Sequence, residues 1–155
     1  MKYRILTDDE LPLFEEELKH FLIVNGVHGD EWAKMNEEHP AEAQKLVGLF
    51  SDTILQKVYE KLRYIEHRTT TSCMVFKLNE EGIEMISINA KSDEVDLSTP
   101  EGIHEALVHQ SEALTFFSHE KEYTKERELE IHEMLEQGCV NSSESFWIQL
   151  KKSIG

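Results

Sequence analysis

Apolar positions recur every three or four residues in the N-terminal part of the chain, as is typical of amphipathic helices. The first stripe predicts a helix from about Asp8 to Asn25, with Thr7 and Glu10 as a capping box at its start. Gly26 follows this helix and supplies the residue type that commonly ends one. The apolar positions of the stripe are Leu11, Phe14, Leu18, Phe21 and Leu22.

Two more helices are expected before the pattern changes. Asp30 is a good N-cap for a short helix that ends near Glu38. Pro40 suits the first turn of a long helix that reaches about Lys61. Gly48 and the pair Ser51-Asp52 leave open whether this long helix is continuous. Its apolar positions are Val47, Phe50, Ile54, Val58, Leu62 and Ile65.

The middle of the chain is rich in β-branched and aromatic residues, which favour strands. Residues 73–78 and 83–89 form two such runs, and residues 79–82 between them are typical of a hairpin loop closed by Gly82. Tyr64–Arg68 is either a third strand or the end of the long helix. Because a lone hairpin is not stable in water, we expect helices across one face.

Helical spacing returns in the C-terminal part. After a polar connection at residues 91–99, a helix is expected to begin at Thr99-Pro100 and to carry an apolar stripe as far as Phe117. A more charged helix is expected from about Glu120 to Gln137.

The end of that charged helix and the start of the last one have recognisable signals. Gly138 would end the charged helix and fold Cys139 back onto Met134. Asn141, with Glu144 three residues later, would cap a last helix. The apolar residues of this last helix are Phe146, Trp147, Leu150 and Ile154.

These elements predict an α+β fold that is mostly helical, with a small antiparallel β-hairpin or three-stranded sheet covered by helices. The alternative is an all-α bundle with an inserted hairpin. A chain of 155 residues fits one domain, residues 1–155, and two halves joined at residues 91–99 would be marginal separately.

Charge narrows the classes of partner. The formal net charge is −15, which repels nucleic-acid phosphate and anionic lipid, so no direct nucleic-acid binding is expected. The start of the chain has no signal-peptide pattern, and no apolar run is long enough for a membrane helix. Two cysteines, Cys73 and Cys139, indicate no disulfide framework. We therefore expect a cytoplasmic protein without a membrane partner, and a homo-oligomer remains open.

The densest mixture of acid, base and hydroxyl groups lies at Tyr64, Glu66, His67 and Arg68, followed by a run of threonines. If this segment is a strand, Tyr64, Glu66 and Arg68 share one face. These four residues are the first candidates for a binding site. Trp32, beside a turn, is a second candidate as an anchor for a partner, although most such tryptophans close the edge of a core.

Two Glu-x-x-His units, Glu17–His20 and Glu101–His104, are weak candidates for metal binding. Facing units of this kind hold the metals of di-iron helical bundles. About 1.3 such units are expected by chance from the composition, and His20 is expected to point toward solvent. We therefore predict no metal site and no cofactor.

Catalytic motifs are also lacking. The chain has no phosphate-binding loop, no dinucleotide fingerprint, no nucleophile elbow and no CxxC pair. These absences make an enzyme the less favoured class.

Two segments, Leu62-Arg-Tyr-Ile-Glu-His-Arg68 and Leu135-Glu-Gln-Gly-Cys139, resemble a family of short uncharacterised bacterial proteins. The likeness extends along most of the chain, including the opening Met-Lys-Tyr-Arg. The resemblance implies a free-standing bacterial protein. It implies no activity, because none is known for that family.

Three functional hypotheses follow. The first is a non-catalytic acidic accessory protein that binds a basic protein partner, with salt-sensitive association. The second is a small enzyme or ligand-binding protein with its site near residues 64–68. The third is a metal-binding helical bundle that uses Glu17, His20, Glu101 and His104.

Overall fold

The computed structural model describes residues 1–154. These residues fall into two compact units, Met1–Glu60 and a second unit that begins at Lys61. The possible junction at residues 91–99 lies inside the second unit. The prediction of one domain stays a prediction.

The first unit is helical. Its helices are η1 (Leu11–Phe14), α1 (Glu15–Val24), α2 (Glu31–Glu38) and α3 (Pro40–Lys61), whose last residue belongs to the second unit. α3 is continuous, which settles the question left open at Gly48 and Ser51. The predicted capping box is confirmed, since the Glu10 N–H donates to Thr7 Oγ1 at 3.2 Å and the Thr7 N–H donates to Glu10 Oε1 at 2.9 Å. The first turn after this box is a 3-10 helix rather than an α-helix.

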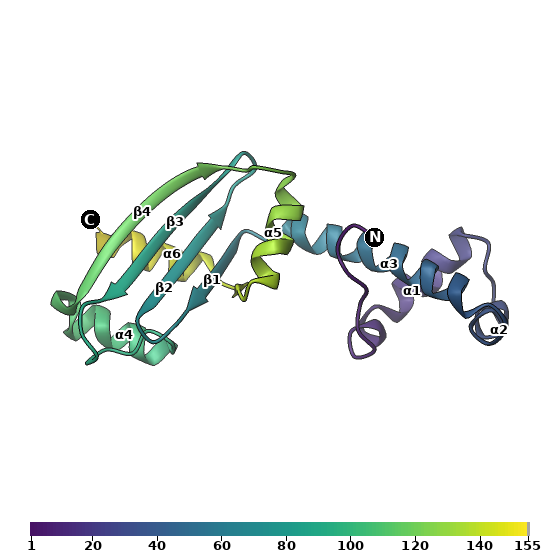
Figure 1. Ribbon diagram of the computed structural model, residues 1–155, viewed down its shortest axis with the longest axis horizontal. Coiled ribbons are helices and arrows are strands. Elements are labelled where there is room, and N and C mark those ends of the chain that lie inside the picture. Colours follow the sequence, from purple (N-terminus) through teal and green to yellow (C-terminus); the bar gives the residue numbers. More distant parts are fainter. Residues whose placement is uncertain (155) are drawn as a thin grey trace. The chain divides into compact units, whose positions relative to one another are not determined.

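The second unit contains a five-stranded antiparallel sheet in the order β4-β3-β2-β1-β5 (Figure 1). The bounds are β1 (Tyr64–Arg68), β2 (Ser72–Leu78), β3 (Gly82–Ala90), β4 (Leu114–Glu122) and β5 (Val140–Asn141). The predicted small hairpin or three-stranded sheet is therefore wrong, and so is the all-α alternative. The hairpin of β2 and β3 is present. β1 extends it through a second hairpin with β2, whereas β4 and β5 join it through pairings that are distant in sequence.

The helices of this unit are α4 (Pro100–His109), a short 3-10 helix η2 (Ser111–Ala113), α5 (Arg127–Glu136) and α6 (Glu144–Ile154). The predicted helix over residues 120–137 begins only at α5, because residues 114–122 form β4. Asn141 is a β5 residue, and the cap of α6 is instead Ser143, whose Oγ accepts the Phe146 N–H at 3.2 Å.

Strand register places one face of the sheet against α4 and α6. Val75, Ile86 and Ile88 point to this face and pack with Ile103 of α4 and Leu150 of α6 in the main core. Figure 1 shows α6 running behind the sheet. We call this side, which also carries Tyr64, Glu84 and Glu120, the covered face.

The opposite face is partly covered by α5. Lys121 points to this face and its Nζ lies 2.8 Å from Glu130 Oε1 of α5. Arg127 of the same helix donates hydrogen bonds to the Leu78 carbonyl at 3.1 Å and, through Nε, to the Asn79 carbonyl at 3.1 Å. These contacts attach α5 to one end of the sheet, so the other end of this face keeps exposed groups such as Phe117.

Candidate functional sites

The first candidate cluster lies on β1, and the strand divides it between the two faces of the sheet. Tyr64, Glu66 and Arg68 alternate onto the covered face, as expected for a strand. His67 points to the opposite face. The cluster inferred from sequence is therefore not a single site.

On the covered face, the buried Glu66 and the half-buried Arg68 form an ion pair. The Arg68 Nε contacts the Glu66 carboxylate, which also accepts a hydrogen bond from the Ser142 hydroxyl at 2.6 Å. The guanidinium carbon of Arg68 lies 5.2 Å from the centre of the Phe146 ring. A hollow of about 410 Å³ borders the pair, with Ser98, Gly138, Val140 and Asn141 as its other lining residues.

This arrangement neutralises both charges within the chain. Glu66 has two partners, and the Arg68 guanidinium is held between its carboxylate and an aromatic ring. Cys73 lies beside the pair, and burial raises the pKa of its thiol to about 12, which leaves it a poor nucleophile. The geometry is that of a structural pair, and the binding-site hypothesis at residues 64–68 stays a prediction.

The weak metal candidates are distributed over both units. Glu17 and His20 belong to α1 of the first unit, and Glu101 and His104 belong to α4 of the second. Within residues 1–154 no three or more histidine, cysteine, aspartate or glutamate side chains come together as a metal would require. Trp32, on α2, is partly buried in the first unit.

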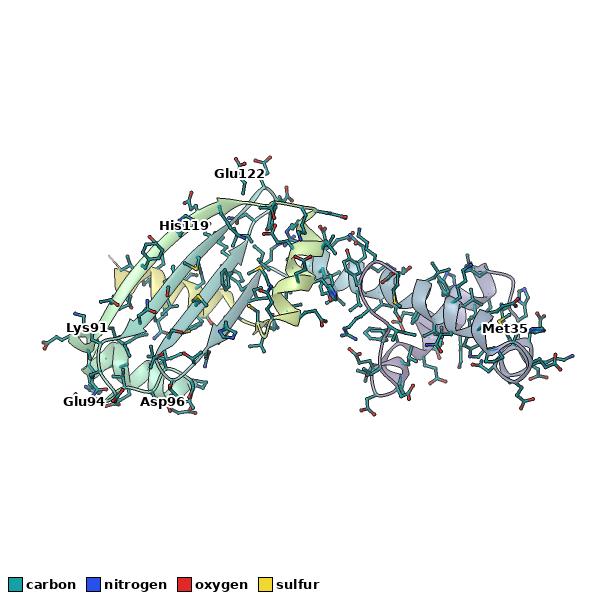
Figure 2. The ribbon with its side chains drawn as sticks, viewed as in Figure 1. Met35, Lys91, Glu94, Asp96, His119 and Glu122 are labelled. Atoms are coloured by element: carbon teal, nitrogen blue, oxygen red, sulfur yellow. The ribbon has the colours of Figure 1, made fainter. Side chains whose placement is uncertain are left out.

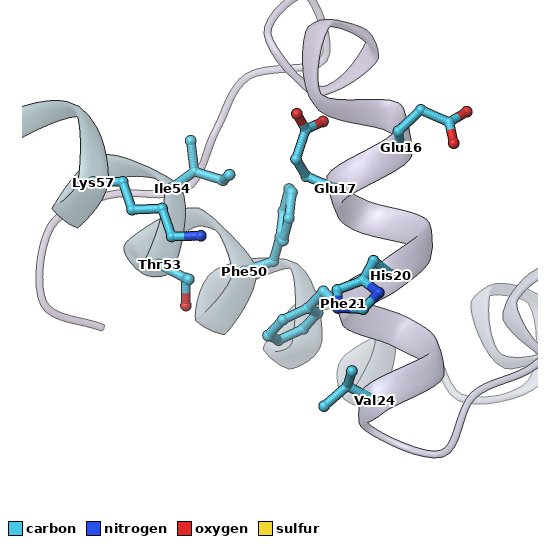
Figure 3. Close-up of a pocket in the computed structure, with 9 residues that line it drawn as sticks. All are labelled: Glu16, Glu17, His20, Phe21, Val24, Phe50, Thr53, Ile54 and Lys57. Atoms are coloured by element: carbon cyan, nitrogen blue, oxygen red, sulfur yellow. The ribbon is translucent and has the colours of Figure 1, made fainter.

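Glu17 and His20 line a groove of about 460 Å³ between α1 and α3 (Figure 3). Phe21 and Phe50 form its apolar part, with ring centres 5.4 Å apart. Lys57 reaches over the groove from α3. This site combines an apolar floor with charges of both signs at its rim, so its chemistry selects no single class of ligand.

A third candidate is the outer edge of β4, which sequence analysis missed because it assigned these residues to helices. β4 has nine residues and is the first strand of the sheet order, so only its inner side pairs with a strand. All of its residues after Phe116 are exposed. Figure 2 shows His119 and Glu122 along this strand.

The register shows which main-chain groups point outward. The Lys91 N–H donates to the Ala113 carbonyl at 2.7 Å, while Ala90 lies opposite Leu114. In an antiparallel ladder this makes Ala90 and Leu114 a non-hydrogen-bonded pair. From this pair onward, hydrogen-bonded and non-hydrogen-bonded pairs alternate along β4. The residues whose N–H and C=O groups face outward are therefore Leu114, Phe116, Ser118, Glu120 and Glu122.

Carboxylates gather beside this edge. Glu84 of β3 lies directly opposite Glu120 of β4, and both point to the covered face. Directly opposed like charges destabilise a sheet. Glu84 is compensated by Lys77 and Lys151, each with its Nζ 3.9 Å from a carboxylate oxygen. Glu120 makes no ion pair or hydrogen bond within residues 1–154.

No described helix is both long and apolar enough to cross a membrane. A family model described as a family of unknown function, DUF6495, matches residues 1–155. The chain belongs to this family. The match confirms the resemblance to an uncharacterised family that the sequence suggested. No curated protein and no solved structure matches the chain.

Membership of DUF6495 assigns no chemistry to any residue, so the candidate sites rest on geometry. Of the three, only the β4 edge offers main-chain groups and charged side chains that are free to meet a partner. A signal for it was present in the sequence, because Leu114-Thr-Phe-Phe-Ser contains β-formers. That signal was assigned to the helical stripe that begins at Ile103.

Proposed function

We propose that this chain is a non-catalytic accessory protein that binds an extended, basic segment of a partner protein along the outer edge of β4. The observation that carries the proposal is the nine-residue edge strand with one unpaired side. An exposed strand edge is a template for another strand, since its N–H and C=O groups make the same ladder bonds with any extended chain.

Charge selects the kind of segment. Glu112, Glu120 and Glu122 are exposed beside or on β4, while Lys121 is paired with Glu130. A second copy of this chain would bring the same carboxylates and a net charge of −15 to the edge, so repulsion disfavours self-pairing. A lysine- or arginine-rich segment meets the same edge with attraction.

The other edge of the sheet, formed by β5, is less suited than β4 to the addition of a strand. At the other end of the sheet, β5 has two residues and offers few main-chain groups. Phe117 on β4 is 56% exposed and points to the opposite face, where it stacks with His119 at 6.3 Å between ring centres. This aromatic pair adds apolar contact for the side chains of an added strand.

The test uses two capped peptides as long as β4, one alternating valine with lysine and one alternating valine with glutamate. Isothermal titration with the full chain at low salt should show binding of the lysine peptide alone, weakened as salt rises. Equal binding of the two peptides, or binding of neither, would overturn the proposal.

Two variants at one position isolate the main-chain contribution. Ser118→Pro removes an N–H that faces outward and leaves the ladder to β3 intact, because proline is tolerated where an edge N–H faces solvent. Ser118→Ala removes the hydroxyl and keeps that N–H. We expect the lysine peptide to bind the proline variant about tenfold more weakly than the alanine variant. Equal affinities would contradict strand addition.

A further inference from the structure

A hollow of about 320 Å³ opens on the covered face of the sheet, directly beside the free edge of β4. Two strands and one helix form it. Glu84 comes from β3, Ser118 and Glu120 from β4, and Trp147 and Lys151 from α6. Met85, Ile86 and His119 complete the lining.

The acidic pair in this hollow favours a cation. Directly opposite residues in an antiparallel sheet have Cβ atoms about 5 Å apart, so the carboxylates of Glu84 and Glu120 can both reach one bound group. Lys77, Lys151 and the Asn79 amide already lie beside Glu84. The Glu120 side chain has no such partner in the described part of the chain, so a positive charge between the two carboxylates would still relieve their repulsion. Within residues 1–154 no side chain bridges the two.

Lys151 shows that a cation fits part of the hollow. Its Nζ lies 3.9 Å from Glu84 Oε1 and 5.8 Å from the centre of the Trp147 ring. Its side chain is 60% exposed, so it can leave at little cost. Trp147 is 5% exposed and packs in the main core, so the part of its ring that lines the hollow beneath Lys151 is held in place.

We propose that this hollow binds an arginine side chain of the incoming segment, with its guanidinium between Glu84 and Glu120 and over the ring of Trp147. This inference rests on the proposed function, since an added strand beside Ser118 and Glu120 directs alternate side chains onto the covered face. Arginine fits better than lysine because its planar, weakly hydrated guanidinium bonds two carboxylates and stacks on an aromatic ring.

The hollow is tested separately from the strand with two small probes, N-acetyl-arginine amide and N-acetyl-citrulline amide. Citrulline keeps the planar shape and most donors of arginine but lacks the charge. Binding is followed by the fluorescence of Trp147 in a Trp32→Phe background, which leaves Trp147 as the chain's remaining tryptophan. We expect saturable binding of the arginine probe and none of the citrulline probe.

Matched variants identify the groups involved. Glu120→Gln should lower the affinity for the arginine probe about tenfold, because it replaces a charge-assisted hydrogen bond by a neutral one. Glu112→Gln makes the same charge change outside the hollow and should alter the affinity by less than about twofold. Lys151→Ala, which removes the competing ammonium, should tighten binding by about fivefold.

Each outcome decides a specific point. Equal binding of the two probes, or equal effects of Glu120→Gln and Glu112→Gln, would overturn the arginine site. If the lysine–valine peptide still binds in that case, the proposed strand addition stands without it. Binding of the arginine probe together with failure of the peptide would support the hollow and overturn strand addition.

Discussion

Ser51 accepts the backbone N–H of Leu6 at a fully buried position, with the nitrogen 2.9 Å from Oγ. The Ser51 hydroxyl donates in turn to the Val47 carbonyl at 2.7 Å. One side chain of α3 therefore holds the N-terminal segment against the helix. Leu6 belongs to no helix or strand, and the Ser51 hydroxyl is the acceptor that satisfies its backbone N–H.

Replacing Ser51 by alanine should lower the free energy of unfolding by about 1–3 kcal/mol, since the buried Leu6 N–H loses its acceptor. Thr53→Ala is the control: Thr53 also donates to the carbonyl four residues before it, at Leu49, but is exposed. That variant should stay within about 0.5 kcal/mol of the parent. Urea unfolding followed by circular dichroism measures both, and equal losses would contradict this role of Ser51.

Gly138 should resist substitution because its φ is +110° and it ends α5 in a Schellman motif. The Cys139 N–H donates to the Met134 carbonyl at 3.1 Å, which confirms the expected fold-back. Gly138→Ala should cost about 1–2 kcal/mol, as an L side chain is strained at this φ.

A second glycine provides the comparison for Gly138. Gly48 lies inside α3 without a positive φ, and a Cβ there would meet only the Met1 side chain, at 3.8 Å or more. Gly48→Ala should therefore stabilise the chain by up to about 1 kcal/mol. Thermal unfolding should show a lower Tm for Gly138→Ala and a higher Tm for Gly48→Ala than for the parent. A drop in Tm of similar size in both variants would contradict the argument from φ.

The two thiols should differ in reactivity. Cys73 is fully buried, and burial raises its pKa to about 12, whereas Cys139 is half-buried with a pKa raised by the same cause. An aromatic disulfide reagent at neutral pH should modify Cys139 in the native chain, and Cys73 only after unfolding. Cys139→Ser should abolish the native reaction and Cys73→Ser should retain it. Two thiols reacting natively would be inconsistent with the buried position of Cys73.

Glu10 should contribute to stability in a defined pH window. The Arg4 guanidinium, 2.7 Å away, and the Thr7 N–H hold the pKa of Glu10 at about 2, below its usual value of 4.5. A carboxyl whose pKa is depressed on folding stabilises the fold above the unfolded pKa, and this stability is lost as pH falls through the folded value.

The parent should therefore lose more stability between pH 5 and pH 2 than Glu10→Gln does. The control is Glu37→Gln, which makes the same charge change at an exposed residue of α2. Its pH profile should follow that of the parent. Parallel profiles for the parent and Glu10→Gln in acid titration would rule out the effect.

Local signals in the sequence determined most of the helices. Thr7 with Glu10, Pro40 and Gly138 marked the capping box, the start of α3 and the end of α5, because capping and chain reversal depend on residues within a few positions of each other. The hairpin of β2 and β3 followed from β-forming runs around Gly82 for the same reason.

These local signals do not predict strands that pair with residues far away in the sequence. β4 was assigned to helices because its charged end, His119–Glu122, suits a helix, and because Phe117 continued the spacing of the preceding stripe. Its ladder to β3 joins residues that are distant in sequence, and such pairing overrides local preference. β1 was ambiguous for a different reason, because Ile65 continues the apolar spacing of α3 although the partner strand β2 is close in sequence.

The sequence by itself determined the acidic character of this protein, the places where most helices begin or end, and the face shared by Tyr64, Glu66 and Arg68 once that segment is a strand. Only the tertiary structure decided that Ser142 holds Glu66, that Glu84 faces Glu120, and that one side of β4 is free. Periodicity states which face of an element is apolar. Which other element meets that face, and which strand edge is left without a partner, depends on contacts between residues that the chain brings together only when it folds.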